Sequence, residues 1–295
     1  MILSTLNLHE RDKYINFYDR DIKGNKLHLY LVSGYNGHAI SVTTLAGHFF
    51  GHFDPEKAAN GILESKKMSD PEYKYYGMIK EDILKSWEKN EAGQLGTDLH
   101  ERIEYFYNGC LGESEVPDTI EFQYFLMFFR DSIKLYPKLK PYRTEWFVWT
   151  NPIILNNGME RMITGSIDMT FVNDKGEIAI FDWKRVKELT YINKAGERKI
   201  NIKKDFDTWK ENGRKGYIKN LYGKGLLSHV PDSKYHHYCI QLNIYKYILE
   251  NYYNKKVIMM NLVVCSPTED NYLILKVDDM QDEIRRIIAY DTDHK

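Results

Sequence analysis

The sequence lacks the features of several special classes of protein. No stretch approaches the ~20 apolar residues of a membrane span, and the N-terminus, MILSTLNLHERDKY, meets charge too early for a signal peptide. Three scattered cysteines, Cys110, Cys239 and Cys265, fit reduced thiols better than a disulfide framework, and cannot supply a four-cysteine iron–sulfur cluster. We therefore expect a soluble intracellular protein that has no membrane partner and no iron–sulfur cluster.

The chain also lacks a Pro-, Gly- or Ser-rich linker that would divide its 295 residues into separate domains. It has ample material for a core, because 43% of its residues are hydrophobic and 14% are aromatic. We predict one large domain. Its core spans residues 93–295, and residues 1–92 form an N-terminal hairpin and helical region packed on that core.

The net charge is close to zero, but the charged residues are unevenly distributed along the chain. The whole chain carries −1, which gives no bulk attraction to nucleic acid, whereas residues 184–224 hold thirteen basic and five acidic residues. Aromatic residues alternate with these charges, a mixture typical of surfaces that bind single-stranded nucleic acid. We expect an insertion at about 185–230 to contact DNA through Lys203, Lys204, Arg214 and Lys215. A solvated, mobile insertion is the alternative.

Hydrophobic periodicity predicts an α/β fold with a mixed sheet flanked by helices. Alternation on both sides of GYNG predicts an N-terminal hairpin of residues 27–33 and 38–44. Helices are predicted at about 55–66, 71–90, 94–108, 118–136, 235–253 and from 279. Strands are predicted at 143–150, 161–172, 176–185, 256–266 and 271–277, the first three as a meander.

Three charged residues interrupt the apolar alternation of the last two meander strands. Side chains two apart on a strand share a face, so Asp182 and Lys184 project together, and the turn VNDKG can bring Asp168 beside them. Contacting carboxylates raise each other's pKa, and partly buried charge is costly unless it is compensated. A solvated ion pair at a strand end is the plain interpretation of this pattern.

A divalent cation would remove the conflict between the carboxylates. Hard oxygen ligands, including a backbone carbonyl such as that of Trp183, suit Mg²⁺ or Mn²⁺. Such an ion, with a lysine beside it, can orient a water, assist its deprotonation and neutralise charge on a scissile phosphate. The pattern therefore favours a metal-dependent phosphodiester hydrolase.

Five short motifs follow one another along residues 96–245. They are Gly96 to His100 (GTDLH), Glu145, Gly165 to Asp168 (GSID), Asp182 to Lys184 (DWK) and Gln241 to Tyr245 (QLNIY). In this order they resemble the RecB-type exonuclease branch of the PD-(D/E)xK nuclease superfamily. The overall layout is similar to viral and phage relatives of the mitochondrial genome maintenance exonuclease. Ile167 stands where the superfamily name has proline, as is common in that branch.

The resemblance implies a restriction-endonuclease-like core and a role for each matching residue. His100, Asp168 and Asp182 would be metal ligands, and Lys184 would be the catalytic lysine. Glu145 would support the metal shell or a bound water. Gln241 and Tyr245 would position DNA or brace the active site.

Together these features predict a Mg²⁺- or Mn²⁺-dependent deoxyribonuclease of viral or phage type. We expect an exonuclease that acts on single-stranded DNA ends or overhangs. Two alternatives stay open. One is a structure-specific endonuclease on the same scaffold, and the other is a catalytically inactive nucleic-acid-binding module.

Overall fold

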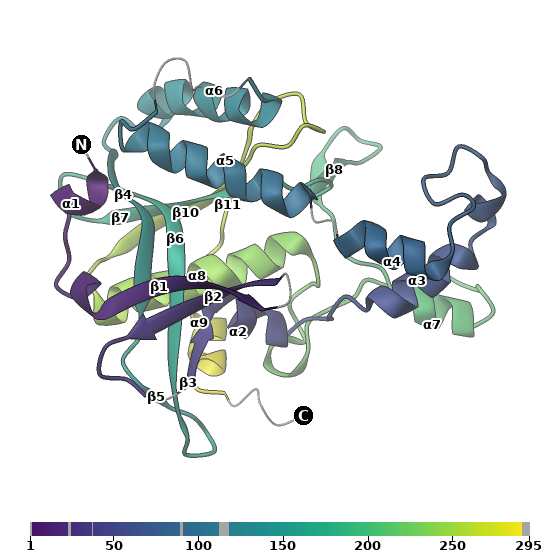
Figure 1. The fold of residues 1–295 in the computed structure, drawn as a ribbon, viewed down its shortest axis with the longest axis horizontal. Helices are drawn as coiled ribbons and strands as arrows, with labels where there is room; N and C mark the ends of the chain where they lie inside the picture. The colour runs from purple at the N-terminus through teal and green to yellow at the C-terminus, as the bar shows by residue number, and fades with distance from the viewer. Residues whose placement is uncertain (1, 23–24, 37, 89–90, 112–117, 291–295) are drawn as a thin grey trace.

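A mixed seven-stranded sheet flanked by helices forms the centre of the computed structural model (Figure 1). The structure describes residues 2–22, 25–36, 38–88, 91–111 and 118–290. The strands of the sheet run in the order β11-β10-β7-β6-β3, with β4 and β5 also paired to β6. Their bounds are β3 His38–Ser41, β4 Lys140–Trp149, β5 Ile153–Ile154, β6 Glu160–Val172, β7 Ile178–Lys184, β10 Val257–Val264 and β11 Leu273–Lys276.

Helices cover both faces of this sheet and define two separate hydrophobic cores. On one face α2 (Val42–His48), α8 (Lys234–Tyr252) and α9 (Gln281–Ile287) share a buried cluster. On the other face α5 (Glu91–Tyr107) and α6 (Ile120–Leu135) pack in an aromatic cluster. Successive side chains of β7 point to opposite faces of the sheet, so Ile180 belongs to the first cluster and Phe181 to the second. The predicted α/β class is thus confirmed, and the arrangement is compatible with a restriction-endonuclease-like core.

Strand β6 pairs on both edges, but one edge has a gap. Strands β4 and β5 lie along one edge. On the opposite edge β7 pairs with residues 169–172 and β3 pairs with residues 161–164. Among the described residues, therefore, Gly165 to Asp168 have no strand partner on that edge. The GSID motif occupies this gap.

The predicted N-terminal hairpin was wrong in its second strand. Residues of β2 (Asn25–Val32) pair with β1 (Ile15–Ile22), not with residues 38–44. Residues 38–41 instead form β3, parallel to β6, and Ser41 then caps α2 by accepting a hydrogen bond from the Thr44 amide. Alternation over so few residues does not distinguish a hairpin strand from a strand that leads into a helix. Part of the predicted N-terminal region is therefore a component of the main sheet.

Three further helices form a lobe beside the sheet, and we call it the helical lobe (Figure 1). They are α3 (Pro55–Leu63), α4 (Lys80–Glu88) and α7 (Phe206–Glu211). An ion pair of 2.6 Å between Lys57 and Asp207 joins α3 to α7. The predicted helix at 71–90 is shorter than expected, because residues 70–79 form turns, with Gly77 at a φ of 72°.

The remaining elements are short. They are α1 (Leu3–Leu6), the antiparallel pair β8 (Thr190–Ile192) and β9 (Arg198–Ile200), and 3₁₀ turns at Asp12–Tyr14, Lys66–Ser69 and Gly225–Leu227. Within the described ranges, no helix is both long and apolar enough to cross a membrane. The other predicted helices and strands are present, with ends displaced by up to a few residues.

Candidate metal centre

The site begins where the ladder between β6 and β7 ends. Met169 and Phe181 are the last paired residues, so Asp168 and Asp182 are the first residues beyond the ladder on either strand. Beyond this point β7 continues along β10 up to Lys184, while β6 continues along β4. The two strands thus separate at the two aspartates, and polar side chains occupy a position where a continuous sheet would have backbone hydrogen bonds.

Asp168 replaces one of those backbone hydrogen bonds. The amide of Trp183 donates to Asp168 Oδ2 over 3.0 Å. The Asp168 side chain is only 9% exposed, and this bond fixes it at the split between the strands. A buried carboxylate is therefore accommodated because it accepts a donor that the sheet leaves unpaired.

His100 reaches the same point from α5. Its Nε2 lies 2.9 Å from the carbonyl oxygen of Trp183. Donation from Nε2 leaves Nδ1 as the lone-pair nitrogen, and Nδ1 lies 3.5 Å from Asp168 Oδ2 and 4.0 Å from Glu145 Oε1. Burial lowers the pKa of His100, and the nearby Asp168 opposes this only in part. The neutral imidazole, which is the form that binds metals, is favoured.

Glu145 completes the group from β4. Its neighbours Thr144 and Trp146 pair with Met169 and Ile167, so Glu145 stands opposite Asp168. Its φ of 40° is unusual for a residue with a side chain, and Ser166 Oγ donates to Glu145 Oε2 over 2.7 Å. Burial, followed by the charge of Asp168, raises the pKa of Glu145 to about 8.

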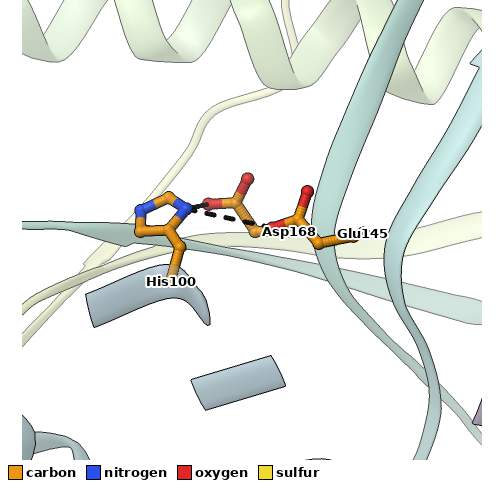
Figure 2. Close-up of side chains that lie close together, drawn as sticks. All are labelled: His100, Glu145 and Asp168. Atoms are coloured by element: carbon orange, nitrogen blue, oxygen red, sulfur yellow. Dashed lines mark ion pairs between the residues drawn. The ribbon is translucent and has the colours of Figure 1, made fainter. Parts of the chain in front are cut away.

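These three residues form a possible metal-ion site. One ligand atom from each of His100, Glu145 and Asp168 lies within 4.8 Å of the others. Figure 2 shows the imidazole and both carboxylates pointing toward one another. Two carboxylate oxygens and one imidazole nitrogen suit a hard or borderline divalent cation. The donor set therefore suits a divalent cation.

Asp182 and Lys184 form a second layer behind this group. Lys184 Nζ lies 2.5 Å from Asp182 Oδ2 and 4.0 Å from Asp168 Oδ2. The Lys184 ammonium also lies 4.8 Å from the ring centroid of Tyr238. Burial would lower the pKa of Lys184, but the charges of Asp182 and Asp168 outweigh it, so the net shift is upward. Lys184 is a cation held against two carboxylates.

Asp182 lies outside the group of converging ligand atoms. The sequence predicted His100, Asp168 and Asp182 as metal ligands, and the group contains His100, Glu145 and Asp168. Asp182 is 2% exposed and bound to Lys184. Burial, followed by the charge of Asp168, raises the pKa of Asp182 to about 7. Similarly, the Trp183 carbonyl, predicted as a ligand, contacts the imidazole of His100.

Gln241 and Tyr245 lie behind the gap in β6 rather than on the surface. Tyr245 is 3% exposed and Gln241 is 9% exposed. A Cβ atom on Gly165 would lie 2.8 Å from Cε1 of Tyr245. Both residues are therefore buried, and the two predicted roles, positioning DNA and bracing the site, stay predictions.

Gly96 of α5, unlike Gly165, is not packed against a side chain of another element. Apart from its chain neighbours and the backbone of its own helix, no described atom lies within 4 Å of the position that a Cβ on Gly96 would take. His100 is positioned by its contact with Trp183, not by the space at Gly96.

The predicted DNA-binding basic residues are not members of the group of converging ligand atoms. Lys203 Nζ is 2.8 Å from Asp232 Oδ1, and Lys204 donates to Asn220 Oδ1. Arg214 and Lys215 are exposed and follow α7 in the helical lobe, to one side of the sheet (Figure 1). Their contact with DNA therefore stays a prediction.

A cleft of about 710 Å³ opens in front of His100 and Glu145. Glu101 and Glu104 of α5 line it, as do Ser166 and Phe147. Burial, together with the charge of Glu101, raises the pKa of Glu104. The spacing of Glu104 from His100, four residues along α5, places both side chains on one face of the helix. Sequence reasoning gave no signal for Ser166 or Phe147, because only strand pairing places them beside Glu145.

No family model and no curated protein matches the chain. Among solved structures, that of SSO0001 is similar over 86% of this chain and 74% of its own, with 14% identical residues and a TM-score of 0.34. A likeness at this level carries no inference about activity.

Proposed function

We propose that the protein is a Mg²⁺- or Mn²⁺-dependent deoxyribonuclease. In this proposal it hydrolyses phosphodiester bonds as an exonuclease on single-stranded DNA ends or overhangs. The observation that supports it is the convergence of His100, Glu145 and Asp168 at one point, with Lys184 Nζ 4.0 Å from Asp168. The five motifs of the RecB-type branch include all four of these residues.

The charges of the site support the binding of a cation. Asp168 and Asp182 lie beside the ammonium of Lys184, and the Glu145 carboxylate lies 4.0 Å from the imidazole of His100. Burial, followed by the charge of Asp168, raises the pKa values of Glu145 and Asp182, so the site has carboxyl groups in excess of its one ammonium. When bound by His100, Glu145 and Asp168, a divalent cation would supply Lewis acidity toward water and phosphate.

Lys184 has a distinct part in the proposed reaction. Its raised pKa keeps it protonated, so it donates hydrogen bonds and does not act as a base. Asp182 and the Tyr238 ring hold the ammonium in place beside Asp168. From there it stabilises negative charge that develops on a phosphate.

A labelled-substrate panel tests the proposal. Linear single strands, blunt duplexes and circular single strands are incubated with Mn²⁺, with and without chelator. Product from linear strands alone, abolished by chelator, is the expected result. Product from circles would assign an endonuclease, since a circle has no end. The absence of product from every substrate would favour a binding module.

A matched pair of lysine variants links any activity to the site. Lys184→Ala should reduce turnover roughly 100- to 1,000-fold, the usual effect of removing one stabilising donor. Lys187→Ala changes an exposed lysine three residues later and should leave turnover unchanged. Equal turnover in the two variants would remove Lys184 from the mechanism.

A further inference from the structure

The cleft in front of the candidate metal centre is lined by residues of two chemical kinds. His100, Glu101, Glu104 and Glu145 are polar or acidic. Leu8, Ile15, Tyr30 and Phe147 are apolar or aromatic. The proposed function uses only residues of the first kind.

Charge does not draw a nucleic-acid backbone into this cleft. Glu101, Glu104 and Glu145 repel phosphates, and Arg143, a cation of the lining, is already held by Asp12 over 2.5 Å. A strand that enters must therefore gain binding energy from its bases as well as from a bound cation. The aromatic residues of the lining, Tyr30 and Phe147, are able to supply it.

The two aromatic residues are arranged as a pair. The rings of Tyr30 on β2 and Phe147 on β4 have centroids 5.9 Å apart and an interplanar angle of 73°. Both side chains are half-buried and line the cleft. An edge-to-face pair is a stable arrangement that holds the rings in fixed orientations. Half-burial leaves part of each residue accessible from the cleft.

Phe147 is also tied to the metal centre by strand geometry. It follows Glu145 by two residues on β4 and pairs with Ser166, whose hydroxyl donates to Glu145. Two residues of a strand span ~7 Å, so the ring lies about one nucleotide away from the candidate ligand. A phosphate near Glu145 would thus place its own base, or the next base, beside Phe147.

We propose that Phe147 and Tyr30 form a stacking site for the nucleobase next to the scissile phosphate. The proposal rests on the proposed nuclease function, which fixes where that phosphate lies. Stacking on an aromatic face accepts every base, so the site selects for an unpaired base and not for a sequence. A base inside a duplex is already stacked and paired, which makes strand ends and overhangs the substrates that this site admits.

Photo-crosslinking tests the proposal without cleavage. A short single strand that carries 5-iodouracil is bound in the presence of Ca²⁺, irradiated, and the attached peptide is identified by mass spectrometry. Attachment to the peptide of Phe147 or of Tyr30 is the expected result. Attachment only to other aromatic residues, such as Tyr217 or Tyr222 on the exposed surface, would overturn the proposal.

Affinity measurements provide a second test. Phe147→Leu and Tyr30→Leu should each weaken binding of the same strand by roughly 5- to 150-fold, the range for losing one stacked base. Tyr30→Phe keeps the ring and should retain affinity. Tyr76→Leu, an exposed tyrosine outside the cleft lining, is the matched control. Unchanged affinity in both leucine variants would reject the site.

The two proposals fail in distinguishable ways. A protein that crosslinks through Phe147 but cleaves no substrate retains the stacking site and loses the nuclease assignment. A protein that cleaves single-stranded ends but crosslinks elsewhere retains the nuclease assignment and loses the stacking site.

Discussion

The ring of Tyr245 fills the space that a side chain on Gly165 would need. A Cβ at Gly165 would lie 2.8 Å from Tyr245 Cε1 and 3.1 Å from Val42 Cγ2. Helix α8 and helix α2 thus both press against the gap in β6, three residues before Asp168. The glycine of the GSID motif is required by packing behind the site.

Gly165→Ala should lower the free energy of unfolding by about 1–3 kcal/mol, the usual cost of an overfilled core. Tyr245 is buried and has little room to move away from the new methyl group. Chemical denaturation measures the loss. Gly96→Ala is the control: open space surrounds that position in α5, so the helix should gain up to ~1 kcal/mol. A neutral Gly165→Ala would contradict the packing argument.

Lys184→Met should destabilise the protein at neutral pH and not only abolish activity. The substitution leaves the carboxylate of Asp182, which is 2% exposed, without its counter-charge. Breaking a buried ion pair in this way costs about 3–5 kcal/mol. Lys184→Met combined with Asp182→Asn removes both charges and should recover most of the lost stability in a thermal unfolding assay. A double variant no more stable than the single one would count against the pairing.

Asp182 and Glu145 should make the metal-free protein less stable as pH rises. They have pKa values of about 7 and about 8, above the ordinary value near ~4 that they take in the unfolded chain. The folded state therefore binds more protons at these two groups, so their stabilisation is complete below pH ~4 and is lost as pH rises through 7 to 8. Histidines with lowered pKa values act in the opposite sense at acid pH, so the contribution of the carboxyl groups is measured as a difference between two proteins. Melting temperatures in chelator from pH 5 to 8.5 should decline more in the wild-type protein than in Glu145→Gln with Asp182→Asn. Parallel profiles in the two proteins would contradict the raised values.

Mn²⁺ should stabilise the protein, and more strongly at pH 8 than at pH 6. A cation competes with the protons that the acidic groups hold, and an ion at one hundred times its Kd adds about 2.7 kcal/mol. Thermal unfolding with Mn²⁺ or chelator measures this difference. His100→Ala and Asp168→Asn should remove it, whereas Glu72→Gln, on the exposed surface, should not. The same shift in all variants would place the ion elsewhere.

The exposed basic residues just before and just after α7 should contribute to DNA affinity in a salt-dependent way. Lys204, Arg214 and Lys215 are exposed, while Lys203 is engaged by Asp232. Replacing the first three by Ala should reduce the slope of log K against log salt by about 2, at ~0.7 for each phosphate contact with a single strand. The control replaces Lys134, Lys138 and Lys140, which are exposed around the end of α6. Equal slopes in the two triple variants would reject a specific role for the lobe.

Much of the fold could be predicted from the sequence, because periodicity is strong where elements are long. The strands at 161–172 and 176–185 and the helix at 235–253 have sustained patterns, and β6, β7 and α8 follow them closely. The short segment at 38–44 did not form the predicted hairpin strand, since its alternation continues directly into helix α2. Its true partner, β6, is more than a hundred residues away in sequence, and no local signal reports such a pairing.

The candidate site could be predicted in composition but not in detail. Spacing alone placed Asp182 and Lys184 on one face, and their side chains are indeed 2.5 Å apart. The choice between Asp182 and Glu145 as partner of Asp168 depends on where the ladder of β6 and β7 ends. Tyr245 and Val42 also pack at Gly165 within the same gap, and this contact among three distant segments leaves no local pattern in the sequence.

The edge of β6 that lacks a strand partner at residues 165–168 also limits how far the chain can be shortened from its N-terminus. The five motifs fall within residues 96–245, yet β3 borders the gap and Val42 packs against its first residue. A fragment that starts at residue 93 would expose that strand edge and the apolar surface of α8 that faces α2. Such a fragment, although it retains every motif residue, should be prone to self-association.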